Sequence, residues 1–194
     1  MHLRRLAMQY SIHETKELAV HLGMQFRTLD MLDDVFDTSV NEPVRVKFEI
    51  LSRCIHSFCV TFNDIKRALE SGEIQNPHTI CKVLMGNSID FDMEPEKWDL
   101  VPTEKHIDRI APLVGNNSLL FLVELGMDFK SWEQIRYRQK ERDLVKLNRD
   151  ILQEWSFTFC NVHTIRPTMR HIVQALTNIG KNIKTIENAL ADLF

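Results

Sequence analysis

Apolar residues recur along most of the chain at intervals of three and four, which is the spacing of one face of an α-helix. The clearest run is Leu144, Leu147, Ile151, Leu152 and Trp155. Strict alternation of apolar and polar residues, which marks a half-buried strand, is nearly absent. The pattern therefore predicts an all-α protein.

The hydrophobic pattern also repeats. Residues 22–27 (Leu-Gly-Met-Gln-Phe-Arg) return as residues 125–130 (Leu-Gly-Met-Asp-Phe-Lys), an offset of 103. Three shorter matches follow in the same order, at offsets of 101, 107 and 106: Ile50-Leu51 with Ile151-Leu152, Ile65/Ala68/Leu69 with Ile172/Ala175/Leu176, and Ile80/Leu84 with Ile186/Leu190. Ordered matches at nearly constant spacing predict one module written twice. Two copies are too few for a solenoid, so tandem globular modules are expected.

Capping residues, prolines and glycines divide each copy into six helices. In the first copy they predict helices over 2–10, from Ser11 to Gly23, over 28–36, from Pro43 to Val60, over 62–71, and from Asn76 to Gly86. In the second copy they predict helices from Thr103 to Gly115, from Asn117 to Gly126, at the capping box Ser131/Gln134, over 141–158, from Pro167 to Gly180, and from Asn182 to Phe194. The expected fold is two tandem six-helix antiparallel bundles.

The stretch between the copies differs from both. Residues 87–102 lack a helical period, contain Pro95 and Pro102, and hold five acidic residues against a single lysine. Mutual repulsion of the acids favours an extended linker. We therefore expect modules over 1–86 and 103–194 joined by an acidic linker over 87–102, with Trp98 packed on one of the modules.

Composition narrows the class of protein. The net charge is −3, with 44% hydrophobic and 26% charged residues, as in an ordinary globular protein. Neither half is basic enough for non-specific nucleic-acid binding. No apolar run approaches the roughly 20 residues that span a bilayer, and the N-terminal residues do not form a signal peptide. The four cysteines, Cys54, Cys59, Cys81 and Cys160, are each flanked by apolar residues and are predicted to be reduced thiols of the core in a cytoplasmic protein.

Sites for chemistry are sparse. Cys54, His56 and Cys59 could offer metal ligands, as could Cys160 and His163. Residues two apart on a helix face different directions, so packing is the favoured interpretation. A cysteine nucleophile needs a nearby base and an oxyanion site, and the glycines all fall where helices end. We expect no catalytic residue, no metal and no cofactor.

Charge is distributed differently in the two copies. Around the third helix of the first copy lie four carboxylates at spacings of three and four: Asp30, Asp33, Asp34 and Asp37. The equivalent region of the second copy is basic, with Arg136, Arg138, Lys140 and Arg142. A solvated helix face is the simplest explanation of such a run. Opposite charge at equivalent places also suits binding to complementary partners, which makes these eight residues the candidate partner-binding sites.

Aromatic residues add little to this picture. Trp132 and Trp155 lie at helical core positions, so we expect both to be packing residues. Phe157 and Phe159 follow the same helix and are expected to be half exposed, which makes them candidates for an apolar contact.

The layout resembles the death-fold superfamily. Residues 107–194 resemble a death domain, best over 122–126 (Leu-Val-Glu-Leu-Gly), 132–135 (Trp-Glu-Gln-Ile), 149–155 (Arg-Asp-Ile-Leu-Gln-Glu-Trp) and 169–176 (Met-Arg-His-Ile-Val-Gln-Ala-Leu). The pattern from Ser11 to Gly23 is similar to the second helix of death effector domains. The usual exposed aromatic of that helix is replaced by Ala19, and residues 61–86 lack the Arg-x-Asp-Leu motif of effector domains.

An effector-like module, a short acidic linker and a C-terminal death domain are the arrangement of the FADD (Fas-associated death domain) adaptor family, and the sequence is most similar to its insect, immune-deficiency-pathway members. The resemblance implies a non-enzymatic cytoplasmic adaptor in innate immune and apoptotic signalling. Residues 103–194 would bind a death-domain protein of the Imd type. Residues 1–86 would recruit the prodomain of a caspase-8-like, Dredd-like initiator caspase. The alternative is a structural or oligomerising helical scaffold with no caspase partner.

Overall fold

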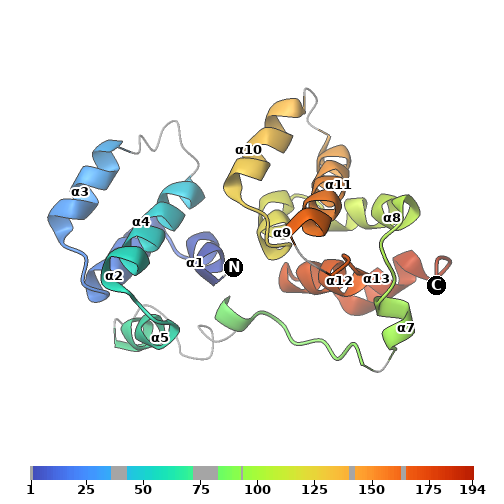
Figure 1. The fold of residues 1–194 in the computed structure, drawn as a ribbon, viewed down its shortest axis with the longest axis horizontal. Coiled ribbons are helices and arrows are strands. Elements are labelled where there is room, and N and C mark those ends of the chain that lie inside the picture. The colour runs from blue at the N-terminus through green and yellow to red at the C-terminus, as the bar shows by residue number, and fades with distance from the viewer. Residues whose placement is uncertain (1, 36–42, 72–82, 93, 140–142, 163–164) are drawn as a thin grey trace. The chain divides into compact units, whose positions relative to one another are not determined.

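The computed structural model describes residues 2–35, 43–71, 83–92, 94–139, 143–162 and 165–194 (Figure 1). All regular secondary structure in these ranges is helical, which confirms the predicted all-α class. The chain divides into two compact units, Met1–Gly86 and Asn87–Phe194. Each unit has hydrophobic core clusters of its own.

The first unit contains helices close to the predicted ones. They are α1 (His2–Gln9), α2 (Ile12–His21), α3 (Phe26–Val35), α4 (Pro43–Phe58) and α5 (Phe62–Ser71). The Ser11 side chain accepts a hydrogen bond from the Glu14 amide, and Glu14 accepts one from the Ser11 amide in return, which confirms the capping box. The sixth predicted helix lies mostly outside the described residues.

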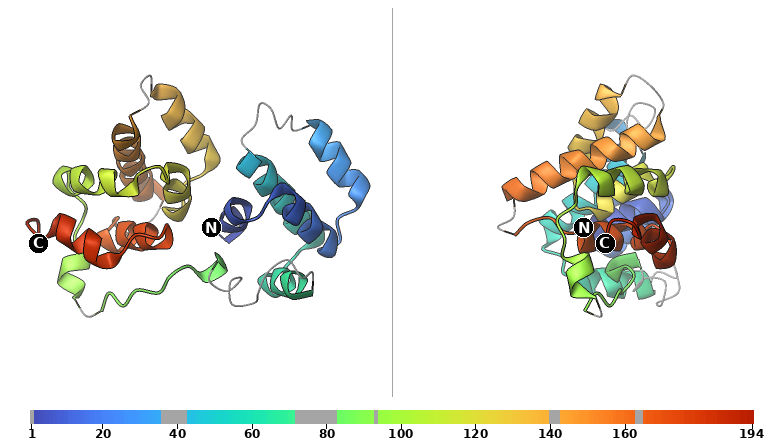
Figure 2. Two further views of the ribbon diagram at one scale, coloured as in Figure 1. Left: turned by 180° about the vertical axis from the view of Figure 1, so that it is seen from behind. Right: turned by 90° about the vertical axis from the view of Figure 1, so that its right-hand side faces the viewer.

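Helix α4 organises the core of the first unit, because it packs along both α1 and α2 (Figure 2). On one side it meets α1 and α5 through a cluster that includes Leu6, Leu51 and Leu69. On the other side a second cluster joins it to α3 through Ala19, Leu29 and Ile50. Burial of these apolar faces, at about 25 cal/mol per Å² of apolar surface, supplies the main driving force for folding.

In the described part of the second unit, a short helix is followed by six longer ones. These are α7 (Pro95–Trp98), α8 (Glu104–Val114), α9 (Ser118–Glu124), α10 (Phe129–Arg138), α11 (Leu144–Val162), α12 (Met169–Asn178) and α13 (Ile183–Leu190). The predicted capping box at Ser131 is wrong. Asp128 is the N-cap of α10, because its side chain accepts a hydrogen bond of 2.7 Å from the Ser131 amide.

The two units share an order of helix contacts. Helix α4 packs on α1 and α2 as α11 packs on α8 and α9, and α5 contacts α2 as α12 contacts α9. The repeated Leu-Gly-Met turn is also built in the same way in both units. The Met24 amide donates to the Ala19 carbonyl at 2.9 Å, and the Met127 amide donates to the Leu122 carbonyl at 3.2 Å. Helices α3 and α10 each follow this repeated turn directly and are therefore equivalent in chain order.

Residues 87–102 belong to the second unit. Trp98 is 3% exposed and lies in its core, which confirms that this residue packs on a module. Arg170 of α12 binds both Asp92 and Asp99, and the Met169 amide donates to the Leu100 carbonyl at 2.9 Å. The segment predicted as an extended linker is therefore anchored along α12.

Candidate interaction surfaces

The acidic candidate residues lie on and after α3. Asp30 is exposed, Asp33 and Asp34 belong to α3 with side chains outside the described set, and Asp37 lies outside the described residues. Leu29 and Leu32 of the same helix are buried, so α3 packs through one face and leaves Asp30 on the other. The Asp30 carboxylate is thus available to a partner.

An aromatic residue accompanies the acidic face. Phe26, the first residue of α3, is 70% exposed and lies one turn before Asp30. An exposed phenylalanine beside a carboxylate gives this face an apolar contact point as well as a charge. Sequence reasoning missed Phe26, although its place directly after the Leu-Gly-Met turn and four residues before Asp30 was a usable signal.

The basic candidate residues lie at the end of α10. Arg136 and Arg138 occupy its last turn, where cations are favoured by the helix dipole, and both are exposed. The Arg138 guanidinium binds Glu154 of α11 at 2.8 Å, and the Arg136 guanidinium lies 6.0 Å from the centre of the Trp132 ring. Lys140 and Arg142 lie outside the described residues.

Tyr137 stands between these two arginines and is 92% exposed, the highest value among the large apolar side chains of the described residues. Its hydroxyl and ring supply the two contact types that interfaces favour. The end of α10 therefore carries two exposed arginines and an exposed tyrosine at consecutive positions, which point in different directions from the helix. Tyr137 is not among the residues predicted from the sequence.

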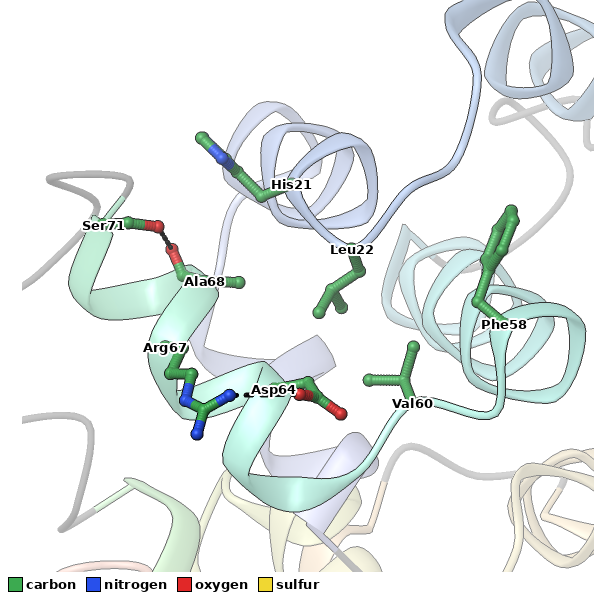
Figure 3. Close-up of a pocket in the computed structure, with 8 residues that line it drawn as sticks. All are labelled: His21, Leu22, Phe58, Val60, Asp64, Arg67, Ala68 and Ser71. Atoms are coloured by element: carbon green, nitrogen blue, oxygen red, sulfur yellow. Dashed lines mark hydrogen bonds and ion pairs between the residues drawn. The ribbon is translucent and has the colours of Figure 1, made fainter.

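A pocket of about 390 Å³ opens in the first unit between α2, the end of α4 and α5 (Figure 3). Leu22 and Val60 point toward one another across it, and Phe58, which is 47% exposed, stands at one side. The polar rim is formed by His21 of α2 and by Asp64, Arg67 and Ser71 of α5. An apolar floor with a charged rim suits a hydrophobic side chain of a partner protein.

Two contacts fix the rim. The Asp64 carboxylate accepts hydrogen bonds from the Thr61 hydroxyl and amide, which lower the pKa of Asp64 below its usual value. Arg67 lies 3.9 Å from the same carboxylate. Asp64 is therefore ionised at neutral pH, and both signs of charge are present at the rim.

The face of α2 differs from the one expected by resemblance. Ala19 is fully buried and belongs to the core, so it does not occupy the exposed face of the helix. The exposed stripe is polar, with His13, Glu17 and His21 at intervals of four and a His13–Glu17 contact of 3.3 Å. The aromatic contribution near α2 comes instead from Phe58 at the pocket.

The cysteines do not form one class. Cys54 is buried beside the Ala19 carbonyl, and burial raises the pKa of its thiol to about 11. Cys59 and Cys160 are exposed, so the prediction of core thiols is wrong for these two. His56 is exposed, and its Nδ1 contacts the Ser52 carbonyl on its own helix. Cys81 and His163 lie outside the described residues.

The predicted aromatic positions are partly confirmed. Trp132 and Trp155 are buried in the core of the second unit, as expected. Phe157 is exposed, whereas Phe159 packs on Trp155 and His171 with ring centres 5.4 and 4.8 Å away. Phe159 is half-buried, as predicted, and Phe157 is more exposed than predicted.

Comparison with models of protein families, with curated proteins and with solved structures finds no match to this chain. Within the part of the chain that the structure describes, no helix is both long and apolar enough to cross a bilayer. The function is therefore inferred from the surfaces of the two units.

Proposed function

We propose that this protein is a non-enzymatic signalling adaptor of the death-fold superfamily, built from two tandem modules that each bind another death-fold protein. The observation that carries the proposal is the opposite charge of equivalent helices. Helix α3 carries Asp30 at an exposed position, whereas α10 ends in the exposed pair Arg136 and Arg138. Complementary charge selects partners and speeds their encounter, so two related modules with opposite charge suit two different partners.

In this proposal the second unit binds an upstream death-domain protein of the Imd type. An acidic surface of that protein would meet Arg136 and Arg138, and Tyr137 would add an aromatic contact at the same end of α10. The first unit recruits the prodomain of a caspase-8-like, Dredd-like initiator caspase. The pocket between α2 and α5 receives an apolar side chain of that prodomain, and α3 supplies a second, acidic contact. Such an adaptor acts in the cytoplasm in innate immune or apoptotic signalling.

Charge reversal in the full-length chain tests the assignment of each surface. Arg136→Glu with Arg138→Glu should abolish capture of an Imd-like death domain and leave capture of a caspase prodomain unchanged. Asp30→Lys should weaken only the capture of the caspase prodomain. Circular dichroism should match the unaltered protein and the urea midpoint should change only slightly, because the three side chains are exposed and the Arg138–Glu154 pair stabilises the fold weakly. Unchanged capture of the death domain by the double variant would remove α10 from the interface. Failure to capture either partner by the unaltered chain would favour the scaffold alternative.

A further inference from the structure

Two helices of the second unit begin with the same capping box, in which the third helical residue is a histidine. At α8 the Thr103 amide donates to His106 Nδ1 at 3.1 Å, and Thr103 Oγ1 lies 2.7 Å from the same nitrogen. At α12 the Thr168 amide donates to His171 Nδ1 at 3.2 Å, and Thr168 Oγ1 lies 2.9 Å away. Capping boxes ordinarily use Glu or Gln at this position.

The choice of histidine makes both boxes depend on protonation. A backbone N–H can only donate, so each Nδ1 must be an acceptor and each ring must be the neutral Nε2–H tautomer. A proton on Nδ1 removes the acceptor and sets two donors against each other. The positive end of the helix dipole opposes the same charge. Protonation of either ring therefore breaks its box.

The surroundings of His106 add to this preference. The residue is buried, its Nε2 has no hydrogen-bond partner among the described residues, and burial lowers the pKa of the imidazole below its usual value. The Phe194 ring packs beside it, with ring centres 6.2 Å apart. The charged groups on the packed elements include Lys97, which lies against Phe194 and is paired with Glu94 and Glu187. Arg149 of α11 is paired with Glu104 and Asp108, and Arg109 is paired with Asp192.

His171 packs against aromatic rings. Trp155 and Phe159 of α11 lie 6.1 and 4.8 Å from its ring centre. The nearest charged neighbour along its own helix is Arg170, whose guanidinium is held by Asp92 and Asp99.

We propose that the two threonine–histidine boxes make the second unit acid-sensitive, because proton uptake at both Nδ1 atoms opens the first turns of α8 and α12. The same event loosens residues 87–102. Thr103 directly follows that segment, and the Met169 amide, next to Thr168, holds its Leu100 carbonyl. Acidification would therefore destabilise the second unit and weaken binding at the basic surface of α10, whatever partner that surface binds.

The direction of the effect follows from proton linkage. The fold favours the neutral rings, so the unfolded chain binds more protons below the ordinary histidine pKa of about 6.5. The boxes contribute fully above that pH and are lost as the pH falls toward the folded-state values. As the pH falls by one unit in this window, protonation of one ring raises the unfolding equilibrium constant by up to about tenfold. Protonation of both rings raises it by up to about 100-fold. Carboxylates titrate near pH 4, below the window.

The tryptophans provide a specific readout. Trp98, Trp132 and Trp155 are the three tryptophans of the chain, and all lie in the second unit. Urea unfolding of the full-length chain, followed by tryptophan fluorescence, should show a midpoint that falls between about pH 7.5 and pH 5.5. His106→Gln with His171→Gln keeps the acceptors and removes the titration. This variant should lose little stability over the same range, and each single variant should show about half of the wild-type loss.

His13→Gln with His56→Gln serves as the matched control, since both residues are exposed in the first unit. It should retain the wild-type pH dependence. An undiminished fall of the midpoint in the His106/His171 variant would overturn the proposal. If that variant does not fold, nitrogen chemical shifts of the histidine rings decide the question in the unaltered protein. Both rings should be Nε2–H at neutral pH, and an Nδ1–H tautomer at either box would overturn the proposal.

Discussion

Arg170 binds Asp99 through two hydrogen bonds, from Nε to Oδ1 and from Nη2 to Oδ2 at 3.1 Å. The third guanidinium nitrogen reaches Asp92, and the same group lies 5.6 Å from the centre of the Phe91 ring. A planar guanidinium that joins two carboxylates and a ring fixes one conformation of the acidic segment. Residues 87–102 therefore contribute to the stability of the second unit rather than only connecting two modules.

Among residues 87–102, Trp98 should contribute most to the stability of the second unit. Trp98→Ala removes a core side chain and should lower the free energy of unfolding of the second unit by about 3–5 kcal/mol, whereas Trp98→Phe should cost much less. Urea unfolding monitored by the fluorescence of Trp132 and Trp155 measures both. Leu100→Ala, at an exposed position of the same segment, is the control and should change stability by less than about 1 kcal/mol. If Trp98→Ala lowered the free energy of unfolding as little as Leu100→Ala does, the segment would not be part of the folded unit.

Substitution of Gly23 and of Gly126 should cost a similar free energy of unfolding, because the two glycines occupy equivalent turns. They have φ angles of 103° and 82°, a region that disfavours residues with a Cβ. Alanine at either place should therefore cost about 1–2 kcal/mol in its own unit. Asparagine, which tolerates this conformation better, should cost less. Circular dichroism in urea gives both values, and a cost at only one of the two glycines would contradict the equivalence of the turns.

Much of the fold could be predicted because its signals are local. Ser11, Thr103 and Asn182 cap helices as expected, since each cap needs only the next two or three residues. The internal repeat is enough to identify α3 and α10 as equivalent helices, and it thereby locates the candidate surfaces from the sequence alone. Prediction succeeded where a residue and its partner are close in sequence.

The structure differs from the predictions at places where contacts between residues far apart in the sequence determine the local conformation. Asp128 and Ser131 are both acceptable N-caps by local rules, and the burial of Phe129 selects the earlier start of α10. Arg170 is 71 residues from Asp99, so no local pattern shows that the acidic segment is anchored. The exposure of Tyr137 likewise depends on how α10 lies on α11. These features follow from tertiary contacts, which a single sequence does not display.

Asn148 should be a key polar residue of the second unit. It is fully buried on α11, and its Nδ2 donates to the carbonyls of Ala111 and Gly115 at 3.2 and 3.0 Å. Asn148→Ala leaves two carbonyls at the end of α8 without this donor and should cost about 2–3 kcal/mol. Gln153→Ala, which removes an exposed amide of the same helix, should cost less than about 0.5 kcal/mol. Urea midpoints that do not separate the two variants would contradict the role assigned to Asn148.

Glu154 neutralises part of the proposed basic surface, because its carboxylate binds Arg138. Its pair with Arg138 joins side chains that are 31% and 59% exposed, so the pair itself stabilises the fold by no more than about 1 kcal/mol. Glu154→Gln should therefore leave stability nearly unchanged while it releases Arg138 for an acidic partner. The expected result is a gain in affinity of about two- to fivefold for an Imd-like death domain, at the scale of about 0.5–1 kcal/mol.

Titration calorimetry at low and high salt measures that gain. It should shrink as salt rises, because the released charge is screened. Glu104→Gln makes the same change of net charge beside Arg149, away from α10, and should leave the affinity unaltered. Equal gains for the two variants would mean that overall charge, and not the end of α10, attracts the partner. No gain for Glu154→Gln would mean that Arg138 does not contact the partner, which would leave Arg136 and Tyr137 as the residues of this surface still to be tested.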